Sequence, residues 1–140
     1  MTERIFVDTS AWYAAADSDD RSHERASSLL RSWSGRLVTS DHVLIETWFL
    51  TAARLGRQAA ESQFDAIRSG VATVATCDLG DLVTASAIGA EFSDQDFSIV
   101  DRTSWSVMLR LGIHRAISLD ADFSVFRFGV GRRQSFAVER

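Results

Sequence analysis

The stretch RIFVDTSAWYAAA, residues 4–16, joins a short apolar run to a helical pattern, and an aspartate, Asp8, stands at the junction. Residues 4–7 have the length and the β-branched and aromatic side chains of a buried strand. The same alternation of strand-like runs and helical patterns continues along the chain and favours an α/β fold with a mostly parallel central sheet. Further strands are predicted at residues 36–39, 71–76, 115–119 and, with a weaker pattern, 135–139, and helices at 22–33, 41–56, 57–70, 79–92 and 98–112.

The length and composition predict one globular domain spanning residues 1–140, with 46% hydrophobic and 24% charged residues. The single cysteine, Cys77, permits no internal disulfide. The N-terminus reaches Asp8 before a signal-like apolar core forms, and every apolar run is much shorter than the roughly 20 residues of a membrane span. We therefore expect a cytoplasmic protein without a membrane partner.

The absence of lysine excludes several enzyme classes, because all 15 of the Lys-plus-Arg positions are arginine. A Walker A phosphate loop, a Schiff-base amine and a Ser-x-x-Lys nucleophile all need a lysine. A phospho-accepting aspartate normally relies on a nearby lysine too, which argues against that role for Asp8. The remaining classes include enzymes that hold phosphate with arginine or with a metal ion.

Four carboxylates interrupt apolar segments, and they carry the functional prediction. Asp8 and Asp120 each follow a predicted strand, whereas Glu46 and Asp101 lie on otherwise apolar helical stretches. Because ligands of open parallel sheets bind beyond the carboxyl ends of the strands, Asp8 and Asp120 are expected at the same edge. Charged groups in such places cost free energy unless something compensates them, and a divalent cation is the simplest compensation. The pattern predicts a metal-dependent nuclease.

Each acid also has a structural interpretation. Asp8 can cap the helix that follows it, Asp120 or Asp122 can cap the next turn, and Asp101 completes a capping-box spacing with Ser98.

Glu46 lies in a helix that is expected to be buried on most of its circumference, since only Glu46, Thr47 and Thr51 are polar between Val43 and Ala53. Its side chain is therefore either solvated at a helix edge or turned toward a site.

Four segments, in this order, resemble the PIN-domain ribonucleases and specifically the VapC toxins of bacterial type II toxin–antitoxin pairs. They are FVDTSAWYA (6–14), TSDHVLIETWFL (39–50), DQDFSIVDRTSWSVMLRLGI (94–113) and AISLDADF (116–123). The resemblance implies a PIN-like domain with a five-stranded parallel sheet flanked by helices, in which strands one and four are adjacent. It also implies a homodimer and a cognate VapB-like antitoxin whose tail blocks the acidic site.

Carried over to this chain, the resemblance identifies Asp8, Glu46, Asp101 and Asp120 as an acidic quartet that hydrolyses RNA phosphodiester bonds with metal-activated water. The resemblance implies that Asp8 and Asp101 are the principal ligands of Mg²⁺, with Mn²⁺ as a substitute. Possible supporting residues are Thr9, Ser10, Asp96 and Asp122, with Asp120 preferred over Asp122 and with Asp94 as a further acid near the third segment.

Arg127, Arg132 and Arg133 cluster after the fourth segment and are candidates for RNA binding, although a solvated loop explains them equally well. A catalytically silent module that binds RNA or a protein partner is the alternative function. A structure-specific nuclease of the flap or 5′-exonuclease kind shares the acidic chemistry, but the short chain disfavours it.

Overall fold

The computed structural model describes residues 2–140 and has a five-stranded sheet at its centre. All strand pairs are parallel, and the order is β3-β2-β1-β4-β5, so the predicted neighbourhood of strands one and four is confirmed. All five predicted strands are present, although each has only three or four residues. They are β1 (Ile5–Val7), β2 (Leu37–Ser40), β3 (Thr73–Ala75), β4 (Arg115–Ile117) and β5 (Ala137–Glu139).

The predicted helices are also present, and local signals explain several of their ends. Ser40 and Ser98 cap α3 and α6 by accepting a backbone N–H, and Gly112 ends α6 in the left-handed conformation that glycine adopts at low cost. The helix predicted at 57–70 ends as α4 at Ala66 and continues as a π-helical turn, Ile67–Val71, whereas the short α7 and the 3₁₀ turn Val130–Arg132 were not predicted. The helices are α1 (Thr9–Ala16), α2 (His23–Ser32), α3 (Asp41–Leu55), α4 (Arg57–Ala66), α5 (Leu79–Glu91), α6 (Ile99–Leu111) and α7 (Asp122–Val125).

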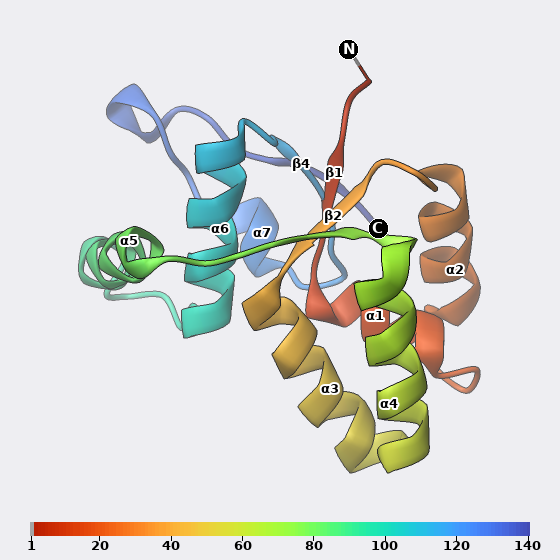
Figure 1. Ribbon diagram of the computed structural model, residues 1–140. Helices are drawn as coiled ribbons and strands as arrows, with labels where there is room; N and C mark the ends of the chain where they lie inside the picture. The colour runs from red at the N-terminus through yellow and green to blue at the C-terminus, as the bar shows by residue number, and fades with distance from the viewer. Residues whose placement is uncertain (1) are drawn as a thin grey trace.

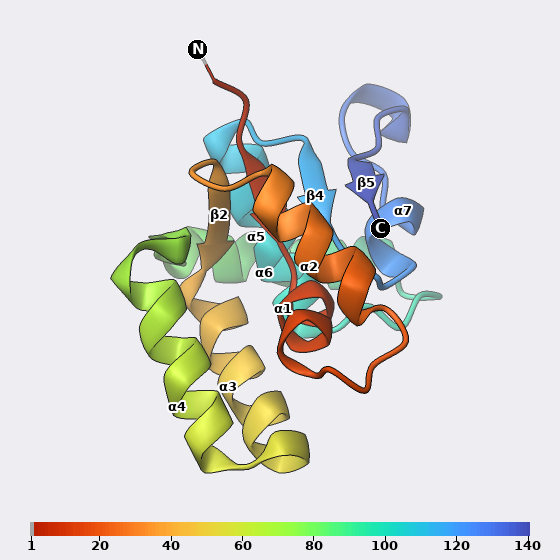
Figure 2. The same ribbon diagram turned by 90° about the vertical axis from the view of Figure 1, so that its right-hand side faces the viewer.

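The helices cover both faces of the sheet (Figure 1). Helices α1 and α2 lie on one face, and α5 and α6 lie on the other. Helices α3 and α4 form a pair that projects beyond the carboxyl ends of the strands, as Figure 2 shows from the side. In the part of the chain that the structure describes, no helix combines the length and apolar character needed to cross a membrane.

The core on the α6 side of the sheet is built around Trp105, which is fully buried. Its ring stacks on Phe126 with centroids 4.4 Å apart, and it meets Phe97 edge-on at 4.7 Å. Such aromatic pairs contribute about 1 kcal/mol each beyond the area that they bury. This packing fixes α6 against the sheet and thereby positions the first turn of α6, which carries Asp101.

The expectation that α3 is buried on most of its circumference is wrong. Ile45 is 53% exposed and Phe49 is 66% exposed, although Val43, Leu44, Thr47 and Thr51 are buried. Because α3 and α4 project from the body of the protein, only one side of α3 reaches the core. An apolar sequence therefore did not indicate burial at these positions, and the exposed strip is a candidate contact surface.

Candidate active site

An acidic cavity of about 350 Å³ lies at the carboxyl ends of β1 and β4, the two adjacent strands at the centre of the sheet. It brings together all four acids of the predicted quartet and all four predicted supporting residues. The lining residues are Asp8, Thr9, Ser10, Glu46, Leu50, Asp96, Ser98, Asp101, Asp120 and Asp122. Asp94 and the three arginines of the C-terminal segment do not line it.

Asp8 directly follows β1 and is almost completely buried. It stands at the N-cap position of α1, yet its side chain does not cap the helix. Instead, Oδ2 accepts hydrogen bonds from Ser10 Oγ at 2.8 Å and from Ser118 Oγ at 2.9 Å. Burial raises the pKa of Asp8, and the charge of Asp120 raises it further, whereas the two hydroxyls oppose the shift.

Asp120 lies in the turn that follows β4, and part of its carboxylate serves local structure. Its Oδ1 accepts the backbone N–H of Asp122 at 2.9 Å, although the N-cap residue of α7 is Ala121 and neither Asp120 nor Asp122 caps the helix. The same turn places Asp122 at the cavity, and one oxygen from each of Asp101, Asp120 and Asp122 lies within 4.8 Å of the others. Asp122, a supporting candidate in the sequence, therefore belongs to the same group of carboxylates as Asp101 and Asp120.

Asp101 comes from the first turn of α6 and is only 7% exposed. Ser98 Oγ accepts the Asp101 backbone N–H at 3.0 Å, but the reciprocal bond of a capping box is not formed between these two described residues. The carboxylate therefore remains available to the cavity. Burial, with the charges of Asp8, Asp120 and Asp122, raises the pKa of Asp101 to about 7.

Glu46 reaches the cavity from α3, and Thr9 fixes its orientation. Thr9 Oγ1 donates a hydrogen bond of 2.6 Å to Glu46 Oε1, which links the end of β1 to α3. Of the two interpretations left open for this glutamate, the one that turns it toward a site agrees with this contact.

The residues present suit a hard divalent cation. All the candidate ligands around the cavity are carboxylate or hydroxyl oxygens, which Mg²⁺ and Mn²⁺ prefer, and the described lining contains no histidine or cysteine that would favour zinc. The pKa of Asp101 is raised first by burial and then by the charges of the neighbouring carboxylates, and a bound cation would offset both effects.

The three C-terminal arginines are all exposed, but two of them have partners within the chain. Arg127 donates to the carbonyl oxygens of Ser124, Val125 and Phe126, and Arg132 pairs with Glu91. Arg133 is exposed. The three side chains therefore do not form one free cationic surface.

Ser118, which no sequence motif singled out, is fully buried beneath the cavity and contacts Asp8. The sequence signal that could have identified Ser118 is its hydroxyl inside the otherwise apolar run AISL, two positions before Asp120.

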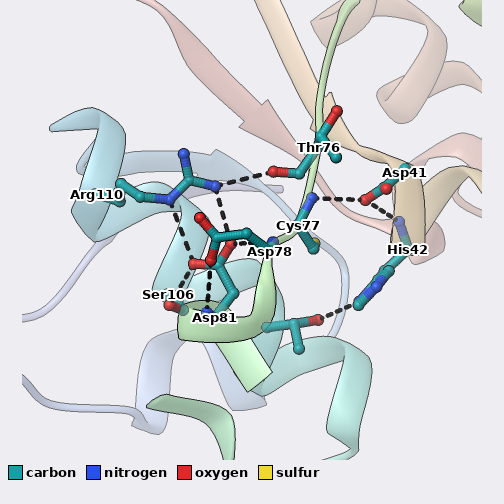
Figure 3. A network of polar contacts seen from close by, with 9 residues as sticks. Asp41, His42, Thr76, Cys77, Asp78, Asp81, Ser106 and Arg110 are labelled. Carbon is teal, nitrogen blue, oxygen red and sulfur yellow. Dashed lines mark hydrogen bonds and ion pairs between the residues drawn. The ribbon is translucent and has the colours of Figure 1, made fainter. Parts of the chain in front are cut away.

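A separate polar network lies at the carboxyl end of β3 (Figure 3). Asp81 is buried and accepts hydrogen bonds from Arg110 Nη2 at 2.9 Å and from Ser106 Oγ at 2.7 Å. Burial alone would raise the pKa of Asp81, but Arg110, the backbone of Asp78 and Ser106 outweigh it and hold the pKa below its usual value. This network joins α5 to α6 and explains the buried charge without a ligand.

Arg110→Ala is expected to lower the free energy of unfolding by about 2 kcal/mol, because it leaves the buried Asp81 carboxylate without its cationic partner. Urea denaturation measures this loss. Arg57→Ala is the matched control, since its pair with Glu61 is exposed and should contribute under about 0.5 kcal/mol. Equal effects of the two substitutions would contradict the structural role of Arg110.

Comparison with known proteins agrees with the fold and with the motifs. The PIN domain model matches residues 5–129. The 23S rRNA-specific endonuclease VapC20 of Mycobacterium tuberculosis is 37% identical over 126 residues, which are 89% of this chain and 95% of the relative. Ribonuclease VapC26 of the same organism is 28% identical over 130 residues, 91% of this chain and 96% of that protein.

Solved structures give the same result. The crystal structure of VapC20, described as a sarcin–ricin loop cleaving toxin, has a TM-score of 0.82 and 36% identity, and the match covers 86% of this chain and 93% of that chain. DNA-bound VapBC from Salmonella typhimurium shares the fold at 14% identity, with a TM-score of 0.66 over 99% of this chain and 98% of that chain. The chain therefore belongs to the PIN-domain family, within its VapC ribonucleases.

Proposed function

We propose that this chain is a metal-dependent endoribonuclease and the toxin component of a type II toxin–antitoxin system. The observation that carries the proposal is the convergence of Asp8, Glu46, Asp101 and Asp120 on one cavity that has only oxygen ligands. The family membership supports it, because the named VapC relatives are ribonucleases.

The metal of this site is proposed to be Mg²⁺, with Mn²⁺ as a substitute, held principally by Asp8 and Asp101. Asp120 and Asp122 are proposed to complete the ligand set, since their carboxylates lie within 4.8 Å of that of Asp101. When bound, the cation supplies charge stabilisation for the phosphate and lowers the pKa of the attacking water.

The protein residues supply orientation. Ser10 holds the Asp8 carboxylate by a hydrogen bond, and Thr9 holds Glu46 Oε1. Glu46, on the α3 side of the cavity, is proposed to orient the attacking water by accepting a hydrogen bond from it. Each of these acids comes from a different element, so their relative positions depend on the packing of α3 and α6 against the sheet.

The substrate is proposed to be a loop of ribosomal RNA. VapC20, which resembles this chain over most of its length, is named as a 23S rRNA-specific endonuclease and as a sarcin–ricin loop cleaving toxin. Arg133, which is exposed and, unlike Arg127 and Arg132, has no partner among the contacts described above, is proposed to contact the phosphate backbone.

Cleavage of purified ribosomes and of total RNA tests the function. We expect cuts at discrete positions with Mg²⁺ or Mn²⁺, no cuts with EDTA, and loss of cleavage in Asp8→Asn. End mapping of the products identifies the RNA. Folded wild-type protein that binds RNA without cutting it under any metal would favour the silent binding module instead, and cleavage that survives EDTA and Asp8→Asn would place the chemistry elsewhere.

The antitoxin is proposed to dock on the groove between α3 and α4. A cavity of about 220 Å³ there is lined mainly by Ile45, Trp48, Phe49 and Phe64. Ile45 and Phe49 directly precede Glu46 and Leu50, which line the acidic cavity, so a segment bound in the groove is close to the site that it must block. A cytoplasmic location is proposed as the place where such a pair meets its RNA.

A homodimer is proposed to form through α5. Leu79, Leu82 and Val83 are exposed apolar side chains at helical spacings of three and four, so they share one side of α5. Val83→Glu is expected to shift the mass measured by light scattering from dimer to monomer without loss of thermal stability. Ser28→Glu, on the exposed side of α2, is the control and should remain dimeric. A wild-type protein that is monomeric at tens of micromolar would contradict the proposal.

A further inference from the structure

Ser118 joins the ends of the two strands that carry the site. It directly follows β4, and its side chain is fully buried. Its Oγ donates to Asp8 Oδ2 at 2.9 Å and accepts the backbone N–H of Asp120 at 3.1 Å. A longer contact of 3.4 Å reaches the Asp120 carbonyl oxygen. One hydroxyl therefore contacts the carboxylate of one quartet acid and the backbone of another.

Ser10 forms a parallel connection from the β1 side. Its Oγ donates to the same oxygen, Asp8 Oδ2, at 2.8 Å and accepts the backbone N–H of Leu119 at 2.9 Å. Each hydroxyl has a single proton, so both protons are directed at one carboxylate oxygen. Asp8 Oδ1 is the oxygen that neither hydroxyl engages. The two serines also satisfy consecutive backbone amides of the turn that carries Asp120.

Burying the Ser118 hydroxyl costs free energy, and the apolar packing around it does not compensate that cost. The preceding residues of β4, Ala116 and Ile117, are fully buried and apolar, and a hydroxyl among them must be hydrogen-bonded to be tolerated. The described side-chain partners of Ser118 are Asp8, Asp120 and, at 3.5 Å, Ser10 Oγ, and all three line the acidic cavity. Ser104 provides the contrast, because it is equally buried but donates only to the Val100 carbonyl of its own helix.

We propose that Ser118 is a positioning residue of the acidic site, which holds one oxygen of Asp8 and the Asp120 turn in a fixed relation so that a divalent cation finds its ligands already placed. The inference rests on the proposed metal-dependent function. Without the hydroxyl, Asp8 loses one of its two hydroxyl donors and keeps that of Ser10, and the Asp120 amide loses its acceptor. The carboxylates then have more freedom, and metal binding must restrict them.

Direct Mn²⁺ titration without RNA tests the proposal, with manganese binding measured by electron paramagnetic resonance. Ser118→Ala is expected to weaken Mn²⁺ binding by about tenfold, the lower end of the effect typical for residues that orient metal ligands. Ser118→Thr, which keeps the hydroxyl, should restore the affinity. Ser104→Ala removes a hydroxyl of equal burial and should leave Mn²⁺ affinity unchanged. In RNA cleavage at fixed subsaturating Mn²⁺, Ser118→Ala should lower kcat while KM for RNA stays within twofold.

The outcomes separate this inference from the proposed function. If wild-type protein binds Mn²⁺ and Asp8→Asn does not, the metal site stands, and equal affinity in wild type and Ser118→Ala overturns the role of Ser118. An equal loss of affinity in Ser104→Ala also overturns it, because the effect would then reflect general loosening. If Ser118→Ala fails to fold, Ser118→Cys keeps the volume with a weaker donor, and wild-type affinity in that variant overturns the proposal. Wild-type protein without Mn²⁺ binding would instead reject the proposed metal site itself.

Discussion

Asp101→Asn is expected to reduce RNA cleavage in saturating Mg²⁺ by about 100-fold or more, equivalent to about 3 kcal/mol of lost transition-state stabilisation. Asp101 is the acid whose pKa is raised to about 7, because it is buried beside Asp8, Asp120 and Asp122. Asparagine keeps the shape of the side chain but removes the negative charge that a cation would neutralise. Single-turnover cleavage of the mapped RNA measures the effect.

The same substitution is expected to stabilise the metal-free protein at pH 7.5. Burial disfavours the charged form of Asp101, and the neighbouring carboxylates repel it when no cation is present; the neutral amide removes both costs. Asp94→Asn is the matched control, since Asp94 is an exposed acid of the same segment that does not line the cavity. We expect Asp94→Asn to retain wild-type cleavage and stability. Retained cleavage in Asp101→Asn would remove Asp101 from the metal site.

The free energy of unfolding of the metal-free protein is expected to fall as the pH rises from about 4 to about 7. Burial, followed by the neighbouring carboxylates, raises the pKa of Asp101 from 3.8 to about 7. Between these values the native state binds more protons than the unfolded state, so stability is greatest at the acidic end and is lost as Asp101 ionises. A shift of this size corresponds to as much as about 4 kcal/mol. The pKa values of Asp8 and Asp122 are also raised, so both carboxyl groups act in the same direction.

Urea denaturation in EDTA between pH 4.5 and 7.5 measures this dependence. The lower limit avoids the region where Asp81, whose pKa is lowered, loses its own contribution as the pH falls. Asp101→Asn should flatten the profile, and Mg²⁺ should raise stability most at pH 7.5, where the carboxylates are ionised and able to bind it. A wild-type profile that rises with pH in EDTA would contradict the assigned pKa of Asp101.

The opposed effects expected for Asp101 have one physical origin. The carboxylates of Asp8, Asp120 and Asp122 repel that of Asp101. The fold tolerates this repulsion because the packing of Trp105 and the hydroxyls of Ser10 and Ser118 hold the surrounding elements in place. The repulsion lowers the stability of the metal-free protein and raises the affinity for a cation. The site is therefore formed at the expense of stability.

Local patterns in the sequence were sufficient to predict most of the secondary structure. Strand and helix periodicity depends on neighbours within about four residues, and so do the caps at Ser40, Ser98 and Gly112. The positions of Asp8 and Asp120 after apolar strands likewise indicated a common edge, because parallel strands present their carboxyl ends together. The five-strand sheet with strands one and four adjacent followed from the family resemblance and is confirmed.

Only the tertiary structure decided which side chains meet at that edge, how they are hydrogen-bonded and how their pKa values are shifted. The Ser118–Asp8 hydrogen bond joins residues 110 positions apart, and it depends on the register of β1 against β4, which no local pattern encodes. The same holds for the raised pKa of Asp101, for the proximity of Asp122, and for the exposure of Phe49 on a helix with an apolar sequence. The sequence by itself determined the elements and the acidic residue types, since these follow from short-range geometry and composition. Burial, charge repulsion and hydroxyl orientation are properties of distant residues brought together, so they arose only when the sheet and its helices packed.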